Sequence, residues 1–424
     1  MSRSLWNLVV LCSFGVAYVA YGAACRGKPA GDVNAELLPA DAGLVPRVPG
    51  FTQSAPNLPT SVEVTFSGET LGTNGLPFIP VTSGNPYFVD GWGLTINEFI
   101  VVVGNVRLNE NPTMDMTWPD DGAQVASKAG PFAFDAHQAK GFLGKDGVEP
   151  AQAMFVWKTM DDGSNFDSTV RYAFSYDTEQ AAYPAWNLNL TAQGQVDYAT
   201  MVQNGWNKYL TATATFVGGG TYDNANDPNA AHAQAQFAKF PATVNFTFGW
   251  NDSGSLENCV NADLGDSALL SNRGIEIFPD KAAIAQITMH VDHLYWDELL
   301  HEGAPLRFDP IAAWAPRDGS TFDLNRDFHH QHLAAVFQDG TPIPDRGPFE
   351  PNAGPSVGGA QFATDQPNGG LQIVMNKNGN NSVPDDYVQF MAFSAQSQMH
   401  LNAQGLCYVV GQHPQDPFYT PDVH

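Results

Sequence analysis

Short runs of apolar residues alternate along this chain with clusters of glycine, asparagine, aspartate and proline. Side chains on a strand point alternately to its two faces, so alternating apolar and polar positions predict a half-buried strand. The pattern predicts strands at residues 61–66, 90–108, 153–159, 168–177, 185–191, 209–218, 241–250 and 283–291. Helical spacing of apolar residues predicts one helix over residues 193–206. Together these elements predict a mostly β fold, an antiparallel β-sandwich with short helices and long loops rich in Gly, Pro and Asn.

The run at residues 90–108 is predicted to be a core strand. Residues 99–103 within it are all apolar, which predicts burial on both faces, and Gly104 directly after them predicts a bulge or bend. Near the end of the chain, residues 371–377, 387–401 and 405–411 predict three further strands of an antiparallel meander.

The net charge of the chain limits the classes of partner that it is expected to bind. The 424 residues include 44 acidic and 19 basic side chains, a net charge of −25. A surface this acidic disfavours nucleic acids and anionic membranes and attracts cations, although acidic residues also serve solubility in general. We therefore expect no nucleic-acid partner.

The N-terminus has the features of a secretory signal peptide. Arg3 precedes an apolar stretch at residues 5–20 that is too short for a stable membrane span. Residues 21–25 (YGAAC) resemble a bacterial lipobox, in which the cysteine receives the lipid, and ordinary cleavage after Ala24 is the alternative. The resemblance implies a protein anchored through Cys25 in the bacterial cell envelope, at the periplasmic or outer-membrane surface.

This interpretation divides the chain into three parts. We expect a signal peptide over residues 1–24, a flexible tether rich in Pro, Ala and Gly over residues 25–60, and a folded domain over residues 61–424. The folded domain could consist of two packed halves, 61–270 and 271–424. If Cys25 carries lipid, Cys259 and Cys407 remain as an even pair, which predicts a disulfide in an oxidising compartment.

Groups able to bind metal are densest at residues 287–314. His290, Asp292 and His293 follow the predicted strand at residues 283–291, and His301 lies near the end of a predicted short helix that starts at Trp296. Neutral imidazole suits copper, zinc, nickel or iron, and a nearby carboxylate can ligate or orient an imidazole. The sequence thus predicts a metal site at a strand end. Strand alternation would place His290 and Asp292 on the face opposite His293.

A second histidine cluster follows. Asn325 or Asp327 is predicted to cap a short helix carrying His329 and His332, which would share a face because they are three residues apart. Methionines offer softer ligands: a Met-x-Met pair at residues 114–116, and Met399 beside His400. Filling a hydrophobic core is the alternative role for these methionines.

Two segments carry a family resemblance. INEFIVVVGNVRL (residues 96–108) and LLHEGAPLRFDPIAAWAPRDG (residues 299–319) resemble segments of the periplasmic copper-binding family associated with methanobactin uptake. The resemblance implies an antiparallel β-sandwich, copper bound by histidines, and a tryptophan that a partner haem enzyme oxidises to kynurenine. The corresponding residues here are His301 and either Trp314 or Trp296.

The sequence is compatible with three functions. The first is a non-catalytic lipoprotein that captures or delivers a metal, copper by expectation, with a redox or transport partner protein. The second is a module that binds glycans or proteins through aromatic residues on a β-sandwich. The third is a hydrolase that uses Asp292 with Asp297 or Glu298 as paired carboxylates, together with His293. The sequence lacks an H-E-x-x-H helix, a P-loop and a dinucleotide fingerprint, so an enzyme is the least supported.

Overall fold

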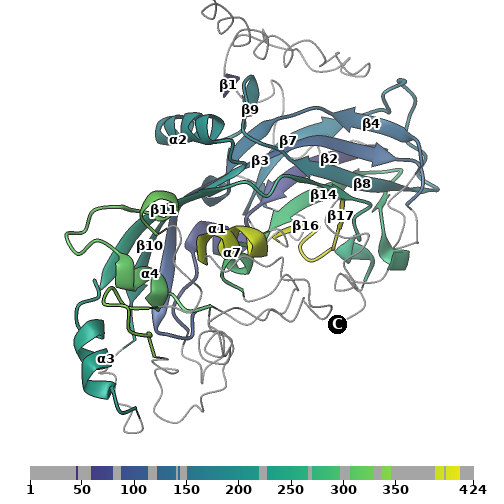
Figure 1. The fold of residues 1–424 in the computed structure, drawn as a ribbon. Coiled ribbons are helices and arrows are strands. Elements are labelled where there is room, and N and C mark those ends of the chain that lie inside the picture. Colours follow the sequence, from purple (N-terminus) through teal and green to yellow (C-terminus); the bar gives the residue numbers. More distant parts are fainter. Residues whose placement is uncertain are drawn as a thin grey trace, which may run out of the picture.

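A computed structural model shows the fold and describes the chain in twelve stretches. These are residues 44–45, 59–79, 87–112, 122–139, 142–143, 150–218, 227–265, 270–296, 306–328, 336–344, 387–395 and 398–410. The described residues form two mixed β-sheets with short helices around them (Figure 1). The mostly β prediction is therefore confirmed.

The larger sheet has the path β1-β9-β5-β3-β10-β11-β15, with five more strands joined to it off this path. Its strands are β1 (Leu44–Val45), β3 (Trp92–Asn109), β4 (Gln124–Lys128), β5 (Phe132–Asp135), β8 (Arg171–Thr178), β9 (Ala185–Asn187), β10 (Lys208–Phe216), β11 (Thr243–Trp250), β12 (Gly254–Glu257), β13 (Ile275–Glu276), β15 (Phe322–Asp323) and β17 (Tyr408–Val410).

The smaller sheet has the order β16-β14-β2-β7-β6. Its strands are β2 (Ser61–Ser67), β6 (Phe142–Leu143), β7 (Pro150–Trp157), β14 (Ala282–Met289) and β16 (Met399–Leu401). The described α-helices are α1 (Glu69–Asn74), α2 (Ala192–Asn204), α3 (Ala230–Phe237), α4 (Asp309–Trp314), α5 (Leu324–Asp327) and α7 (Tyr387–Ser394). Short 3₁₀ helices are η2 (Ala136–Gln138), η3 (Ala262–Leu264), η4 (Leu270–Asn272) and η5 (Val291–Tyr295).

Strand direction departs from the predicted antiparallel arrangement. β2 and β14 pair in parallel, as do β1 with β9, β5 with β9, and β11 with β15. Parallel neighbours need a long connection between them, and β2 and β14 are separated by most of the larger sheet. Strands from either side of residue 270 share each sheet, so the two halves interleave. Within the expected tether, β1 pairs with β9.

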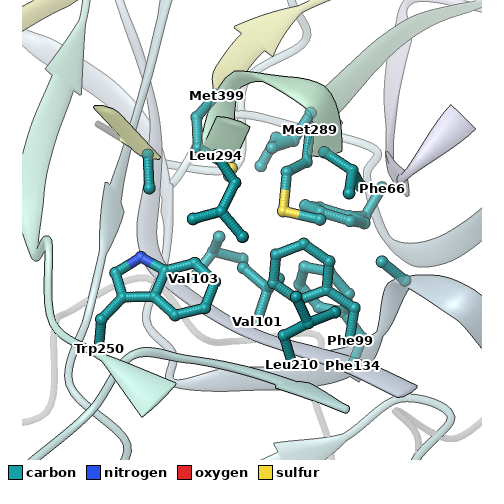
Figure 2. Packing of buried hydrophobic residues seen from close by; sticks show 14 of the residues in the cluster. Phe66, Phe99, Val101, Val103, Phe134, Leu210, Trp250, Met289, Leu294 and Met399 are labelled. Atoms are coloured by element: carbon teal, nitrogen blue, oxygen red, sulfur yellow. The ribbon is translucent and has the colours of Figure 1, made fainter. Parts of the chain in front are cut away.

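The core lies between the two sheets. Phe66 and Met289 of the smaller sheet face Phe99 and Phe134 of the larger one (Figure 2), and the rings of Phe66 and Phe134 are 3.5 Å apart between centroids. Residues 99–103 of β3 are fully buried, as the unbroken apolar run predicted.

The predicted irregularity after residue 103 is confirmed. The pairing of β3 with β8 shifts register between Gly104 and Arg107, and Asn105 has a left-handed φ of 45°. The Arg107 guanidinium then contacts the carboxylates of Asp177 at 2.9 Å and Glu257 at 2.7 Å. The bulge therefore turns an ion-pairing residue onto the sheet.

The segment at residues 387–401 is not one strand. Its first part forms α7, and only Met399–Leu401 forms a strand, β16. The apolar residues of α7 are nearly continuous, and periodicity alone does not distinguish such a buried helix from a buried strand. Asp323 caps helix α5 by accepting hydrogen bonds from the backbone N–H groups of Asn325 and Arg326, and α5 ends at Asp327. The predicted helix with His329 and His332 lies outside the described residues.

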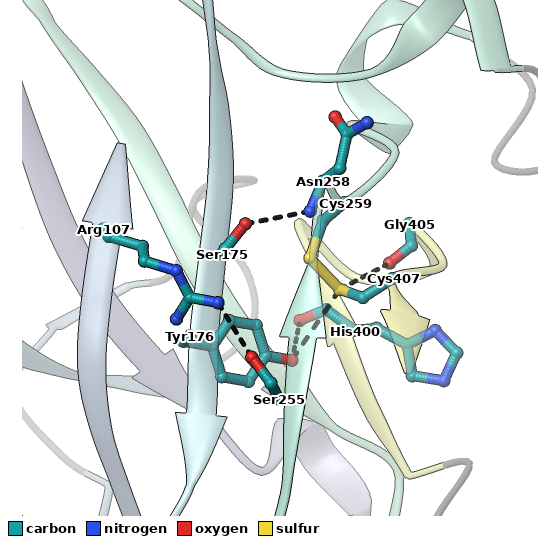
Figure 3. Close-up of a disulfide and its surroundings, with 9 residues drawn as sticks. All are labelled: Arg107, Ser175, Tyr176, Ser255, Asn258, Cys259, His400, Gly405 and Cys407. Carbon is teal, nitrogen blue, oxygen red and sulfur yellow. Dashed lines mark hydrogen bonds between the residues drawn. A yellow bond between two sulfur atoms is a disulfide. The ribbon is translucent and has the colours of Figure 1, made fainter. Parts of the chain in front are cut away.

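The predicted Cys259–Cys407 disulfide is present (Figure 3). It joins the loop after β12 to the segment before β17, and these two strands also pair with each other. The sequence separation of 148 residues means that the bond ties the middle of the chain to its last described strand. None of the helices in the described stretches is both long and apolar enough to cross a membrane.

Beside the apolar contacts of helix α2 with the larger sheet lies a pair of carboxyl groups. The Glu98 carboxyl on β3 hydrogen-bonds the Asp197 carboxylate on α2. Burial is the main cause that raises the pKa of Glu98 to about 9, and the hydrogen bond to Asp197 and the charges of Asp135 and Asp197 add to it. Glu98 is therefore protonated in the folded protein at neutral pH.

We expect Glu98→Gln to remove a pH-dependent loss of stability. Between the ordinary pKa of 4.5 and about 9, the folded state binds a proton at Glu98 that the unfolded state releases, so the free energy of unfolding falls as pH rises. Glutamine keeps a donor for Asp197 without this proton. Urea denaturation from about pH 5 to about pH 9 should show a shallower decline than in the wild type.

The exposed Glu276→Gln on β13 is the control and should leave the decline unchanged. An equal decline in the wild type and Glu98→Gln would contradict a protonated Glu98.

Candidate metal centre

Strand β14 ends at Met289 and the chain turns at once into η5. His290 is the N-cap of this 3₁₀ helix and His293 lies three residues later. Side chains at i and i+3 eclipse in a 3₁₀ helix, so the two imidazoles share a side, with ring centroids 5.1 Å apart. The predicted placement of His290 and His293 on opposite faces is wrong, because the strand ends before it reaches them.

His400 joins the same cluster from β16. Thr288 and His400 are register partners, and the His400 ring lies 4.5 Å from that of His290 and 5.4 Å from that of His293 between centroids. Met289 and Met399, the next pair along, point the other way into the core (Figure 2). The sequence suggested Met399 and His400 together as soft metal ligands. In the fold, only the imidazole of His400 lies at the histidine cluster.

Asp292 supplies a carboxylate. Ligand atoms of His290, Asp292 and His293 all lie within 4.8 Å of one another, close enough to share one ion. The Oδ1 atom of Asp292 is buried and accepts no hydrogen bond from the described part of the chain. Burial raises the pKa of Asp292, and the nearby His290 lowers it in part. A cation in the cluster would relieve the burial cost of this carboxylate.

The tautomer of His290 is fixed by its surroundings. Nε2 lies 2.8 Å from the carbonyl oxygen of Ala403, and because a carbonyl only accepts, Nε2 carries the proton and donates it. Nδ1 lies 3.4 Å from Oε2 of Glu69, an ion pair when the imidazole is protonated. Burial lowers the pKa of His290 and so favours the neutral, metal-binding form. A carbonyl behind an imidazole is how metal-ligating histidines are commonly oriented.

The two candidate tryptophans have different surroundings. Trp296 stacks on His293, with centroids 3.7 Å apart and an interplanar angle of 26°. Trp314 donates its indole N–H to the carbonyl of Val336 and packs against a small apolar cluster near α3. The structure therefore joins Trp296, and not Trp314, to the histidine cluster.

Several predicted residues lie outside the described stretches. They are Cys25, His301, His329 and His332, together with Asp297, Glu298, Met114 and Met116.

A buried ion pair is connected to the histidine cluster by hydrogen bonds. The Lys208 ammonium on β10 donates to Asp252 at 2.5 Å, to Oε1 of Gln398 at 3.2 Å and to the carbonyl of Ala395 at 3.3 Å. The carbonyl of Gln398 in turn accepts the backbone N–H of His290 at 2.8 Å. Ser394 on α7 donates to the carbonyls of His293 and Trp296. The segment between α7 and β16 thus connects the core ion pair to the histidine turn.

Comparison with known proteins returned no match to a family model, to a curated protein or to a solved structure.

We expect Lys208→Met to cost about 3–5 kcal/mol in the free energy of unfolding, because it leaves the Asp252 carboxylate buried without its partner. Burial lowers the pKa of Lys208 and Asp252 offsets this, so the charged lysine depends on that partner. Urea denaturation gives the measurement. The exposed Lys239→Met should have little effect, and the double variant Lys208→Met with Asp252→Asn should regain part of the loss. A single variant as stable as wild type would contradict this account.

Proposed function

We propose that this chain is an extracytoplasmic metal-binding protein that captures or delivers a transition metal, with copper as the expected ion. The observation that carries the proposal is the convergence of His290, Asp292 and His293, with ligand atoms within 4.8 Å of one another, beside the ring of His400. Imidazole and carboxylate are ligands that divalent copper and zinc accept.

Burial supports binding as the role of this cluster. His293 and His400 are each 1% exposed and His290 is 8% exposed. A neutral imidazole is the form that binds metal, and burial disfavours the protonated form. A site this enclosed favours holding an ion over turning over a substrate, so we infer a non-catalytic role.

Two features of the whole chain support an extracytoplasmic location. The Cys259–Cys407 disulfide is of the kind that persists in oxidising compartments. The N-terminal signal-like segment, with Cys25 as the lipidated residue, agrees with anchoring in a bacterial envelope. The net charge of −25 would raise the local concentration of cations around the protein.

We expect the double variant His290→Ala/His293→Ala and the single variant His400→Ala to lose bound metal, because each removes an imidazole from the cluster. Metal per protein, determined by elemental mass spectrometry after loading with Cu(II), Cu(I) or Zn(II), gives the measurement. The wild type should hold close to one equivalent. The variant His232→Ala, an exposed histidine on α3, should keep it.

His301→Ala separates two ligand sets. Loss of copper in this variant alone would favour the set implied by the family resemblance, whereas retention would favour the described cluster. Intact mass of the purified protein also reports oxidation of Trp296 or Trp314. A wild-type protein that takes up none of these ions would contradict the proposed function.

A further inference from the structure

A cavity of about 420 Å³ lies at the end of β11. Its walls come from the end of this strand, from the turn after α2 and from α7 (Figure 1), where Val388 and Ala392 are four residues apart and so share a helix face. None of its lining residues belongs to the group of His290, Asp292 and His293. The volume is within the range of sites that hold small molecules.

The described residues that line this cavity carry no ionisable side chain, although the chain as a whole has a net charge of −25. The polar side chains of the lining are amides, those of Gln180, Asn204, Asn251 and Asn325, beside aromatic and aliphatic groups. A charged ligand would lose hydration here without meeting an opposite charge. The lining therefore favours an uncharged ligand.

Trp206 gives the cavity a flat apolar wall. It follows Gly205, the left-handed C-cap of α2, and its indole lies directly on Gly249 of β11. A Cβ at residue 249 would be 2.1 Å from a ring carbon, so only glycine leaves room for the indole. The ring is also parallel to that of Tyr209 within 15°, and Trp206 is partly exposed. The negative face of such a ring attracts the weakly positive C–H groups of a saturated ring.

Amide groups of the lining have hydrogen-bonding capacity left. The Gln180 amide, Oδ1 of Asn204 and Nδ2 of Asn251 have no partner among the described residues, whereas Nδ2 of Asn204 and Oδ1 of Asn251 bind within their own turns. An amide offers a donor and an acceptor side by side. This arrangement matches hydroxyl groups on neighbouring carbons, each of which both donates and accepts.

The end of β11 is held rigid beside these groups. The side chain of Asn325 accepts the backbone N–H of Gly249 at 2.9 Å and donates to its carbonyl at 2.7 Å, as a neighbouring strand would. Trp250 also lines the cavity, and its buried indole N–H has no acceptor among the described residues. A buried donor of this kind is costly unless water or a ligand supplies an acceptor.

We propose that this cavity binds a neutral saccharide, with the indole of Trp206 stacked on the sugar ring and the amides of Gln180, Asn204 and Asn251 bound to its hydroxyl groups. A planar aromatic ligand would use the indole and leave the amides without partners. An anionic sugar would find no cation in the lining. The inference goes beyond the proposed metal binding and does not depend on it.

Titration of the protein with glucose, galactose, mannose and N-acetylglucosamine tests the proposal, with calorimetry and saturation-transfer NMR as readouts. At least one of these sugars is expected to bind with a dissociation constant of about 1 mM, as a ligand of this size allows. Glucuronate, the anionic counterpart of glucose, should bind about tenfold more weakly than the neutral sugars.

Trp206→Ala should weaken binding about tenfold, and Gly249→Ala should do the same because the added methyl group displaces the indole. Gln180→Ala alters an exposed side chain, so this variant is expected to fold normally and still to lose about threefold in affinity. Tyr183→Ala is the matched control, since this aromatic residue is 45% exposed and outside the lining, and it should bind as the wild type does.

The variant His290→Ala/His293→Ala separates the two proposals, because it should lose metal and keep the sugar. Failure of all the neutral sugars to bind the wild type would overturn the saccharide site and leave the metal proposal standing. Wild-type affinity in both Trp206→Ala and Gln180→Ala would overturn it as well. Tighter binding of glucuronate than of the neutral sugars would overturn the ligand class.

Discussion

Parallel pairing between β2 and β14 is the constraint on which the candidate centre depends. Hydrogen bonds along Ser61–Ser67 fix the register of the two strands, and both strands end at the same edge of the smaller sheet. β16 then pairs with the other side of β14 and brings in His400. Three segments that are distant in sequence thus contribute polar side chains to one edge. A slip of one residue in the pairing of β14 with β16 would turn His400 toward the core and replace it with Met399 or Leu401.

The polar edge is stable because the layer beneath it is apolar and tightly packed. Phe66, Met289 and Met399 fill the face of the smaller sheet that meets the larger one (Figure 2). Burying imidazoles and carboxylates above such a layer costs free energy unless hydrogen bonds or ions compensate. The Lys208–Asp252 pair holds the segment before β16, since Lys208 also binds Gln398 and Ala395 there. The backbone of the histidine turn is thus connected to an ion pair of the core through Gln398.

The sequence was sufficient where local pattern determines structure. The apolar centre of β3, the bulge after Val103 and the Cys259–Cys407 pair follow from periodicity, glycine chemistry and cysteine counting. His290, Asp292 and His293 were also found as a dense group. The contacts that the sequence could not predict are those between residues far apart in the chain. His400 and Glu69 reach the cluster only through strand pairing, and α7 is apolar on nearly all sides, so its helical period is hidden.

An ion held at this edge would add a cross-link between parts of the chain that already meet in the smaller sheet. His290, Asp292 and His293 follow β14 and His400 lies in β16, so their ligand bonds would cross-link these two strands at their ends. Because the unfolded chain lacks this arrangement, the free energy of binding would add to folding stability as the ion concentration exceeds the dissociation constant.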